Sequence, residues 1–212
     1  MIAPPERSAE RDAAIDALLP NVPFDGWTYR ALRAGLAATG GDPRDAEVLF
    51  PGGAPDMIAA FCDLADRRME HDATGLELGE MRTPARIRAV IARRLARNRV
   101  HKEAIRRALA ALAMPGNAGH AALCTARTVD AMWHAAGDHS ADFSWYTKRA
   151  ILTGVYTATL LYWLRDPSED DAATLSFLDR RLAHVGRITR VRRNVESTLR
   201  RLVPPVLRNA AP

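Results

Sequence analysis

Hydrophobic positions recur at intervals of three and four residues through most of this chain. The clearest segments are AAIDALLP, YRALRAGLAA, MIAAFCDLADRRM, RIRAVIARRL and EAIRRALAAL. This spacing is typical of amphipathic helices, whereas runs of β-branched residues with period-two alternation are absent from the sequence. Proline and glycine clusters separate the segments, at Pro20 and at residues 40–43, 51–53, 115–117, 137–138 and 166–168. The pattern predicts an all-α fold of about nine or ten helices without a sheet.

The first helices follow one another at short intervals. They are predicted at residues 7–19, 28–38 and 44–49, and a longer one begins near Pro55. The turn TGGDP joins the second and third helices. This arrangement resembles the helix-turn-helix head of TetR-family transcriptional regulators. We therefore expect a head at residues 7–70, a helical body at 71–186 and a basic amphipathic helix at 187–208.

The acidic charge of the head argues against DNA binding. Residues 7–70 hold seven Arg against eleven Asp and Glu, and the segment PRDAEVLFP offers one Arg beside Asp45 and Glu47. DNA binding depends on Lys and Arg side chains that neutralise phosphates. Regulators also place Tyr, Ser, Thr and Lys around this turn, where this chain has Ala, Glu, Gly and Pro. No nucleic-acid partner is expected, and a TetR-type ligand-responsive repressor remains the alternative function.

The C-terminal segment combines an apolar stripe with an arginine face. Residues 180–212 hold nine Arg and one Glu. At about 100° per residue, Val191, Val195 and Leu199 lie near Ile188, and the arginines other than Arg192 face the other side. We favour an anionic membrane surface as the partner, with docking on the core and nucleic-acid binding as alternatives. The residues expected at the membrane are Arg187, Ile188, Arg190, Val191, Val195, Leu199, Arg200, Arg201 and Leu202.

A second basic block covers residues 80–110, with ten basic and two acidic side chains. Its apolar stripe runs through Ile87, Val90, Ile91 and Leu95 and continues after a break near Asn98. We expect the charges of this block to decorate the exposed faces of two core helices.

Aromatic residues are concentrated between residues 130 and 164, which hold three of the four tryptophans. On a helix, Trp145 shares a face with Lys148 and Arg149, three and four residues further on. Trp beside Arg is the usual composition of a binding hot spot. The sequence therefore predicts a binding surface around Trp145.

Catalytic and metal-binding patterns are absent from the sequence. Cys62 and Cys124 lack metal spacing, and His134, four residues after Asp130, lacks the further ligands that a metal site needs. No Gly-x-Ser-x-Gly motif or glycine-rich phosphate loop occurs. The uncharged runs at 108–126 and 150–164 are too interrupted or too short to span a bilayer. No signal or transit peptide is visible in MIAPPERSAERDA, so we expect a cytoplasmic binding protein.

Several longer motifs carry a more specific resemblance. They are MPGN, DAMWHAAGDHSADFSWYTKRAILTGVYTATLLYW and FLDRRL, together with FDGWT, PRDAEVLFP and GGAPDMIAAFCDLADRRM nearer the N-terminus. Over about residues 10–186 the chain resembles the Coq-nine family of ubiquinone biosynthesis accessory proteins. The combination of AGD, DFxWYTKR and FLDRR is the most specific part of this resemblance.

The resemblance implies a TetR-like fold that has lost DNA binding and gained lipid binding. Family members are not enzymes and use no cofactor. They bind an isoprenoid quinone intermediate, associate with membranes through an amphipathic C-terminal helix, and support the di-iron hydroxylase that acts on demethoxyubiquinone. For this chain we expect a bound isoprenoid quinone or phospholipid and a peripheral location on the cytoplasmic face of the inner membrane. The partner-binding residues that the resemblance implies are Met132, Asp142, Trp145, Tyr146 and Arg149.

The expected lipid pocket lies among the uncharged helices. Its candidate lining residues are Leu152, Val155, Tyr156, Leu160 and Trp163, which are also ordinary core positions. By analogy with TetR-like proteins, a homodimer through parts of residues 150–185 is expected. An interaction scaffold with a dry core is a further alternative, and it predicts that no lipid copurifies.

Overall fold

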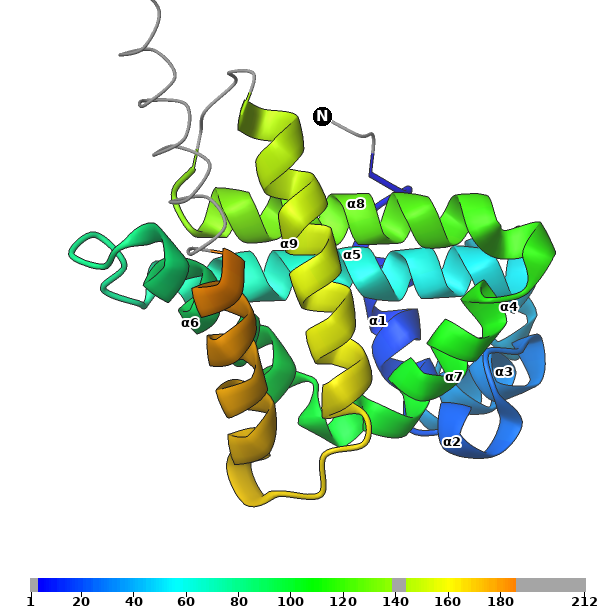
Figure 1. The fold of residues 1–212 in the computed structure, drawn as a ribbon. Coiled ribbons are helices and arrows are strands. Elements are labelled where there is room, and N and C mark those ends of the chain that lie inside the picture. The colour runs from blue at the N-terminus through cyan, green and yellow to red at the C-terminus, as the bar shows by residue number, and fades with distance from the viewer. Residues whose placement is uncertain (1–3, 139–143, 186–212) are drawn as a thin grey trace, which may run out of the picture.

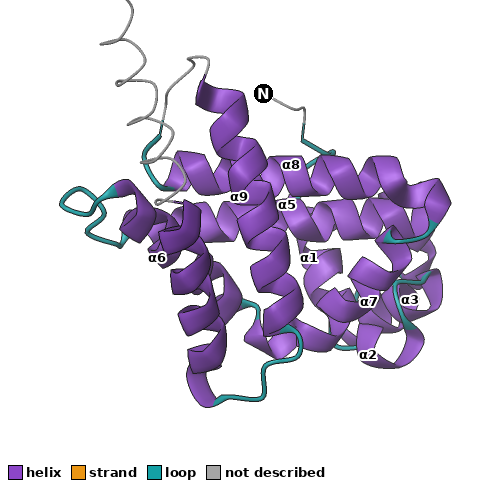
Figure 2. Ribbon diagram, viewed as in Figure 1, coloured by secondary structure: helices purple, strands orange, loops and turns teal. Residues whose placement is uncertain are grey.

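The computed structural model describes residues 4–138 and 144–185, and it confirms the all-α prediction. Within these ranges there are helices and connecting turns and no strand (Figure 2). The helices are α1 (Ala9–Leu18), α2 (Val22–Asp25), α3 (Tyr29–Ala38), α4 (Ala46–Leu49), α5 (Gly53–Thr74), α6 (Thr83–Arg97), α7 (Lys102–Leu112), α8 (Ala118–Ala135) and α9 (Ser144–Trp163). A further helix covers residues 172–185.

The long helices α5 and α8 lie side by side along the middle of the molecule (Figure 1). Helix α9 crosses them and packs chiefly on α8. The helices α1 to α4 and α7 gather at one end of this pair, and α6 and the helix at 172–185 lie toward the other end. The first four helices of the predicted head therefore lie at one end of the central pair, while most of α5, which the predicted range 7–70 also includes, runs along the middle of the molecule.

Local signals in the sequence define the helices of the head. Ser8 and Thr28 each accept a hydrogen bond from a backbone N–H in the first turn of α1 and α3, which are typical N-caps. The two helices cross closely at Gly35, because a Cβ atom there would lie 2.2 Å from the carbonyl oxygen of Ala17. Glycine is therefore required at this crossing.

The core divides into two apolar clusters that meet along α5. One joins α1, α3, the first half of α5 and α7, and its Trp27 donates a hydrogen bond to the carbonyl oxygen of Ala104 at 2.9 Å. The other joins α6, the second half of α8, α9 and the helix at 172–185. Helix α7 thus packs with the head, although it follows α6 in the sequence.

The predicted helix boundaries differ from the observed ones at two points. The segment before α3 contains the short helix α2, which the sequence analysis took as a connection. The predicted helix at 44–49 begins as a 3-10 turn, Pro43–Asp45, so α4 keeps four residues. The expected break near Asn98 is confirmed, where the Asn98 side chain donates to the carbonyl oxygen of Arg94 at 2.8 Å.

The expectation that the basic block at 80–110 is exposed is wrong for Arg94. This side chain is 6% exposed and lies on the buried face of α6 with Val90 and Ile91. Its position three and four residues after those two places it on the same face of the helix. Burial of Arg94 is tolerated because an aspartate faces it.

In the described part of the chain, no single helix is long and apolar enough to cross a membrane. The bent pair Pro43–Leu49 and Gly53–Thr74 meets the criterion by length and composition alone, with 82° between the two helices. The predicted amphipathic helix at 187–208, with all its membrane-binding residues, lies outside the described residues.

Candidate functional site

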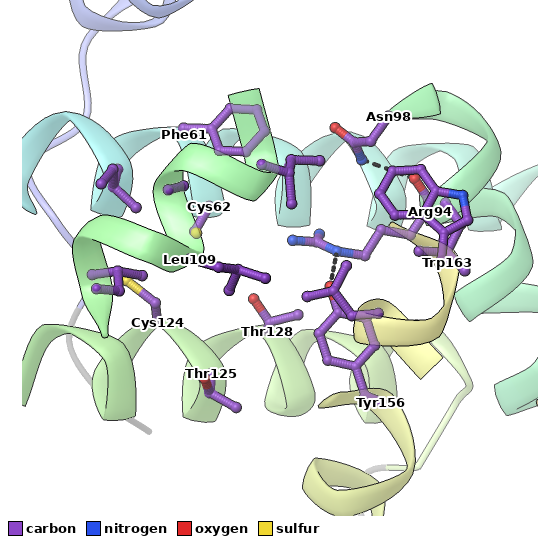
Figure 3. Close-up of a pocket in the computed structure, with 17 residues that line it drawn as sticks. Phe61, Cys62, Arg94, Asn98, Leu109, Cys124, Thr125, Thr128, Tyr156 and Trp163 are labelled. Atoms are coloured by element: carbon purple, nitrogen blue, oxygen red, sulfur yellow. Dashed lines mark hydrogen bonds between the residues drawn. The ribbon is translucent and has the colours of Figure 1, made fainter. Parts of the chain in front are cut away.

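A cavity of about 80 Å³ lies where the two apolar clusters meet (Figure 3). Five helices, α5 to α9, contribute its wall. The lining residues are Ile58, Phe61, Cys62, Ala65, Arg94, Leu95, Asn98, Ile105, Ala108, Leu109, Leu112, Cys124, Thr125, Thr128, Tyr156, Leu160 and Trp163. Most of them are apolar, and a few polar groups converge on one side, which is the usual composition of a small-molecule site.

The polar side of the cavity is a hydrogen-bonded group of four residues, Asp66, Arg94, Thr128 and Tyr156, which we call the polar corner. Arg94 donates from Nη1 to Asp66 Oδ1 at 2.5 Å and from Nε to the Tyr156 hydroxyl at 3.1 Å. The Thr128 hydroxyl donates to Asp66 Oδ2 at 3.0 Å. All four residues are buried; Arg94, Thr128 and Tyr156 line the cavity, and Asp66 pairs with Arg94 from behind the wall.

Burial dominates the electrostatics of the polar corner. It raises the pKa of Asp66 to about 6, although the neighbouring Arg94 charge and the Thr128 hydroxyl act to lower it. At neutral pH Asp66 is therefore mostly ionised and balances the charge of Arg94. Burial also raises the pKa of Tyr156, so its hydroxyl stays protonated.

Two cysteine thiols lie in the apolar part of the cavity wall. Cys62 of α5 and Cys124 of α8 both line the cavity, as Figure 3 shows. The hydrogen bond with Cys124 and burial raise the pKa of Cys62 well above its usual range, so this thiol is neutral. Among residues 4–138 and 144–185, no group of three or more His, Cys, Asp or Glu side chains could hold a metal ion.

Three of the five residues proposed for the lipid pocket line the cavity. They are Tyr156, Leu160 and Trp163, which lie on one face of α9 at spacings of four and three. Leu152 and Val155 are buried in the core of the body and do not line the cavity.

The surface around Trp145 is formed by the N-terminal half of α9. Arg149 lies over the Trp145 ring at 3.8 Å and is held by Asp130 of α8, to which its Nε donates at 2.7 Å. Tyr146 is 76% exposed and meets the Trp145 ring edge-on at 4.7 Å. The cation and the aromatic ring are thus held together before any partner binds.

The other two residues assigned to this surface are not part of it in the structure. Met132 is fully buried in the core of the body, so it is not available for contact with a partner. Asp142 lies outside the described residues.

The sequence analysis missed the polar corner, apart from Tyr156. A usable signal was present in the helical spacing of Asp66 and Arg94. Arg94 falls on the apolar stripe of α6, and Asp66 shares a face of α5 with the buried Met69 and Ala73, three and seven residues further on. Opposite charges on the buried faces of two neighbouring helices indicate a buried pair.

The head has the helix order of a helix-turn-helix unit, but its helix α4 carries no arginine or lysine that could bind a phosphate backbone. Helix α4 has four residues, and its Glu47 pairs with Arg33 of α3. Val48 of the same helix is 79% exposed. Arginine side chains that could reach phosphates are therefore scarce on this helix.

Comparison with known proteins gives related sequences and a related fold. The family described as COQ9 matches residues 118–189. Ubiquinone biosynthesis protein COQ9, mitochondrial, of Rattus norvegicus is 32% identical over 196 residues, which are 89% of this chain and 62% of that protein. The protein of the same name from Schizosaccharomyces pombe is 30% identical over 189 residues, 89% of this chain and 74% of that protein. The chain thus spans less than two thirds of the length of the rat relative.

Among solved structures, the chain resembles a TetR transcriptional regulator from Nitrosomonas europaea. The TM-score is 0.67 at 23% sequence identity, and the likeness covers 84% of this chain and 98% of the regulator. The expected TetR-like fold is confirmed by this likeness.

Proposed function

The chain belongs to the COQ9 family of ubiquinone biosynthesis proteins, and on this basis we propose that it is a non-enzymatic accessory protein of that synthesis. It binds an isoprenoid quinone intermediate in the cavity between α5 and α9 and presents it to a di-iron hydroxylase. The observation that carries this proposal is an apolar cavity with converging polar groups, two of whose five helices, α8 and α9, also form the Trp145 surface.

The volume of the cavity determines how far the helices must move to admit a ligand. A dry cavity of about 150 Å³ accommodates benzene. The cavity here, at about 80 Å³, is roughly half that size. A bound quinone or prenyl unit therefore needs the helices to move apart. Because α9 packs chiefly on α8, its contacts with α6 and α7 are the ones that can open most easily.

Helix α9 connects the cavity with the proposed docking surface. Its second half supplies Tyr156 and Trp163 to the cavity, and its first turn supplies Trp145 and Tyr146 to the surface. At 1.5 Å per residue, Trp145 and Tyr156 are about 16 Å apart along the helix axis. An enzyme docked on the surface would thus meet a ligand that emerges along the same helix.

Membrane association and dimerisation are further parts of the proposal. The basic segment at 187–208 brings the chain to an anionic bilayer, in which a polyprenyl chain is confined. A homodimer through α9 and residues 172–185 is supported by Leu161, which is 53% exposed, and by Tyr162, which stacks on Phe177 at 4.6 Å. Stable dimers bury apolar surface of this kind.

Lipid extraction from matched variants tests the proposal. We expect native mass spectrometry and organic extraction of the purified protein to reveal a bound isoprenoid quinone or a related lipid. Leu160→Trp should fill the cavity and abolish lipid retention. Leu161→Trp, at the adjacent exposed position, should retain the lipid.

Equal lipid content in the two variants would place the ligand outside this cavity. A wild-type protein that carries no lipid and takes up no added quinone would contradict the proposed function and favour the scaffold with a dry core.

A further inference from the structure

The polar corner contains a buried cation with an unused donor. Arg94 is 6% exposed, and its Nε and Nη1 are occupied by Tyr156 and Asp66. Its Nη2 makes no hydrogen bond within the described part of the chain. Figure 3 shows the guanidinium extending among Leu109, Thr128 and Tyr156 toward the middle of the cavity. A buried donor normally has an acceptor, from the protein, from water or from a ligand.

The Tyr156 hydroxyl offers a second donor at the same place. Its oxygen accepts from Arg94 Nε, while its own proton meets no acceptor within the described residues. The hydroxyl and the guanidinium come from different helices, α9 and α6, and meet on one side of the cavity. Two donors at one point match the two lone pairs of a single carbonyl oxygen.

The charge balance of the polar corner selects a neutral acceptor. Asp66 already pairs with Arg94 and is itself held by Thr128. A carboxylate or phosphate bound here would add a negative charge with no cation to balance it in a low-dielectric site. A hydrocarbon chain would leave both donors without acceptors. A ketone or quinone carbonyl satisfies the donors without adding charge.

We propose that Arg94 and Tyr156 bind a carbonyl oxygen of the ligand's quinone ring, so that the ring enters the cavity and the prenyl chain remains outside it. This inference rests on the proposed function and adds which end of the lipid the protein holds. It agrees with the volume of about 80 Å³, since a ring requires less widening than a chain of several isoprene units. The chain can then remain in the bilayer while the ring leaves it.

A single hydroxyl deletion tests this proposal. Tyr156→Phe removes one donor and keeps the ring that lines the cavity, and Tyr162→Phe is the matched control on the same helix, outside the cavity wall. The probes are 2-decyl-1,4-benzoquinone and n-decylbenzene, which share the chain and differ in the carbonyl groups. Titration calorimetry of both probes in the same detergent gives their dissociation constants.

We expect Tyr156→Phe to weaken quinone binding about fivefold to tenfold, the effect of one hydrogen bond. Decylbenzene binding should be unchanged, and Tyr162→Phe should bind both probes like the wild type. In a second measurement, the infrared carbonyl stretch of the bound quinone should lie below its detergent value in the wild type and move back toward it in Tyr156→Phe. The spectrum is recorded after free quinone has been removed by gel filtration, so partial unfolding of a variant lowers the intensity of the bound band and leaves its frequency unchanged.

The outcomes separate this inference from the proposed function. If quinone and arene bind equally and Tyr156→Phe changes neither affinity nor carbonyl frequency, the ring does not meet this corner, although lipid binding stands. If neither probe binds the wild type, the proposed function fails and this inference fails with it.

Discussion

Two buried arginines pair with aspartates of the same helix, α5, and they differ in the surroundings of the one nitrogen that makes no hydrogen bond. In the head, Arg11 pairs with Asp56 at 2.7 Å and also donates to the carbonyl oxygen of Leu49. In the body, Arg94 pairs with Asp66 and with the Tyr156 hydroxyl. The terminal nitrogens of Arg11 are both occupied and its unpartnered Nε is enclosed by protein, whereas the unpartnered Nη2 of Arg94 faces a cavity.

The surroundings explain this difference. Arg11 lies over the ring of Phe50 at 4.3 Å and connects α1 with the end of α4 and the start of α5. It therefore holds the helix-turn-helix arrangement of the head without any ligand. Arg94 has protein partners on one side and cavity on the other. The comparison teaches that an unused donor of a buried arginine indicates a site only where that donor lies at a cavity, and not where protein encloses it.

The largest expected effect is on the Arg94 pair. Arg94→Met leaves the carboxylate of Asp66 buried and unpaired, which should lower the free energy of unfolding by about 3–5 kcal/mol. The double variant Asp66→Leu, Arg94→Met should recover most of this loss, because an apolar pair of similar volume replaces both charges. Chemical denaturation measures the three free energies.

The double variant also tests whether the Arg94 pair, unlike the Arg11 pair of the head, takes part in ligand binding. If the Arg94 pair serves the ligand, the folded double variant should lose its preference for quinone over arene. A double variant that is folded and still prefers quinone would contradict a role of the polar corner in quinone binding.

The Arg11 pair should show a smaller effect that depends on no ligand. Arg11→Met removes its bond to Asp56 and the bond to Leu49, at an expected cost of about 2–3 kcal/mol, since Asp56 is partly exposed. In a chain of this length, that corresponds to roughly 4–12 °C in melting temperature. Arg33→Met, which breaks the exposed pair with Glu47, is the control and should cost less than about 0.5 kcal/mol. Quinone affinity of folded Arg11→Met should equal that of the wild type.

The pH dependence of stability distinguishes Asp66 from the more ordinary carboxylates. Burial raises the pKa of Asp66 to about 6, so the folded protein holds this proton more tightly than the unfolded chain. Its contribution to stability is complete below about pH 4 and is lost as the pH rises through about 6. From pH 4 to pH 7 the loss should be about 2–3 kcal/mol. Asp66→Asn should lack this component, so its stability relative to the wild type should improve over that interval.

Asp166 should act in the opposite direction. Burial acts to raise its pKa, but hydrogen bonds from Ser168 and Thr174 lower it well below its usual range. Its contribution is therefore present above about pH 4 and lost in stronger acid.

For Asp66, a difference in the free energy of unfolding between wild type and Asp66→Asn that stays constant from pH 4 to pH 7 would contradict the assignment.

The sequence predicts the fold well because its apolar periodicity is continuous and its turns contain proline and glycine. It also predicts Tyr156, Leu160 and Trp163 as lining residues, since the uncharged second half of α9 places them on one face. Helical periodicity does not show which apolar face borders a cavity, and for this reason Leu152 was assigned to the pocket.

Charged and partner-binding positions were harder to predict. Arg94 was taken as exposed because it belongs to a run of basic residues, although its register on α6 is that of the apolar stripe. Met132 was assigned to the docking surface from a resemblance of motifs, and packing of α8 against α6 and α9 buries it. Both outcomes depend on tertiary contacts that a single sequence does not show.

The most direct test of ligand binding in the cavity is a titration with 2-decyl-1,4-benzoquinone, followed by tryptophan fluorescence. Trp163 is fully buried and lines the cavity, so a quinone bound there should quench its emission. We predict saturable quenching in the wild type and in Leu161→Trp, and only weak, non-saturating quenching in Leu160→Trp. Saturable quenching of equal strength in all three proteins would contradict the assignment of the ligand to this cavity.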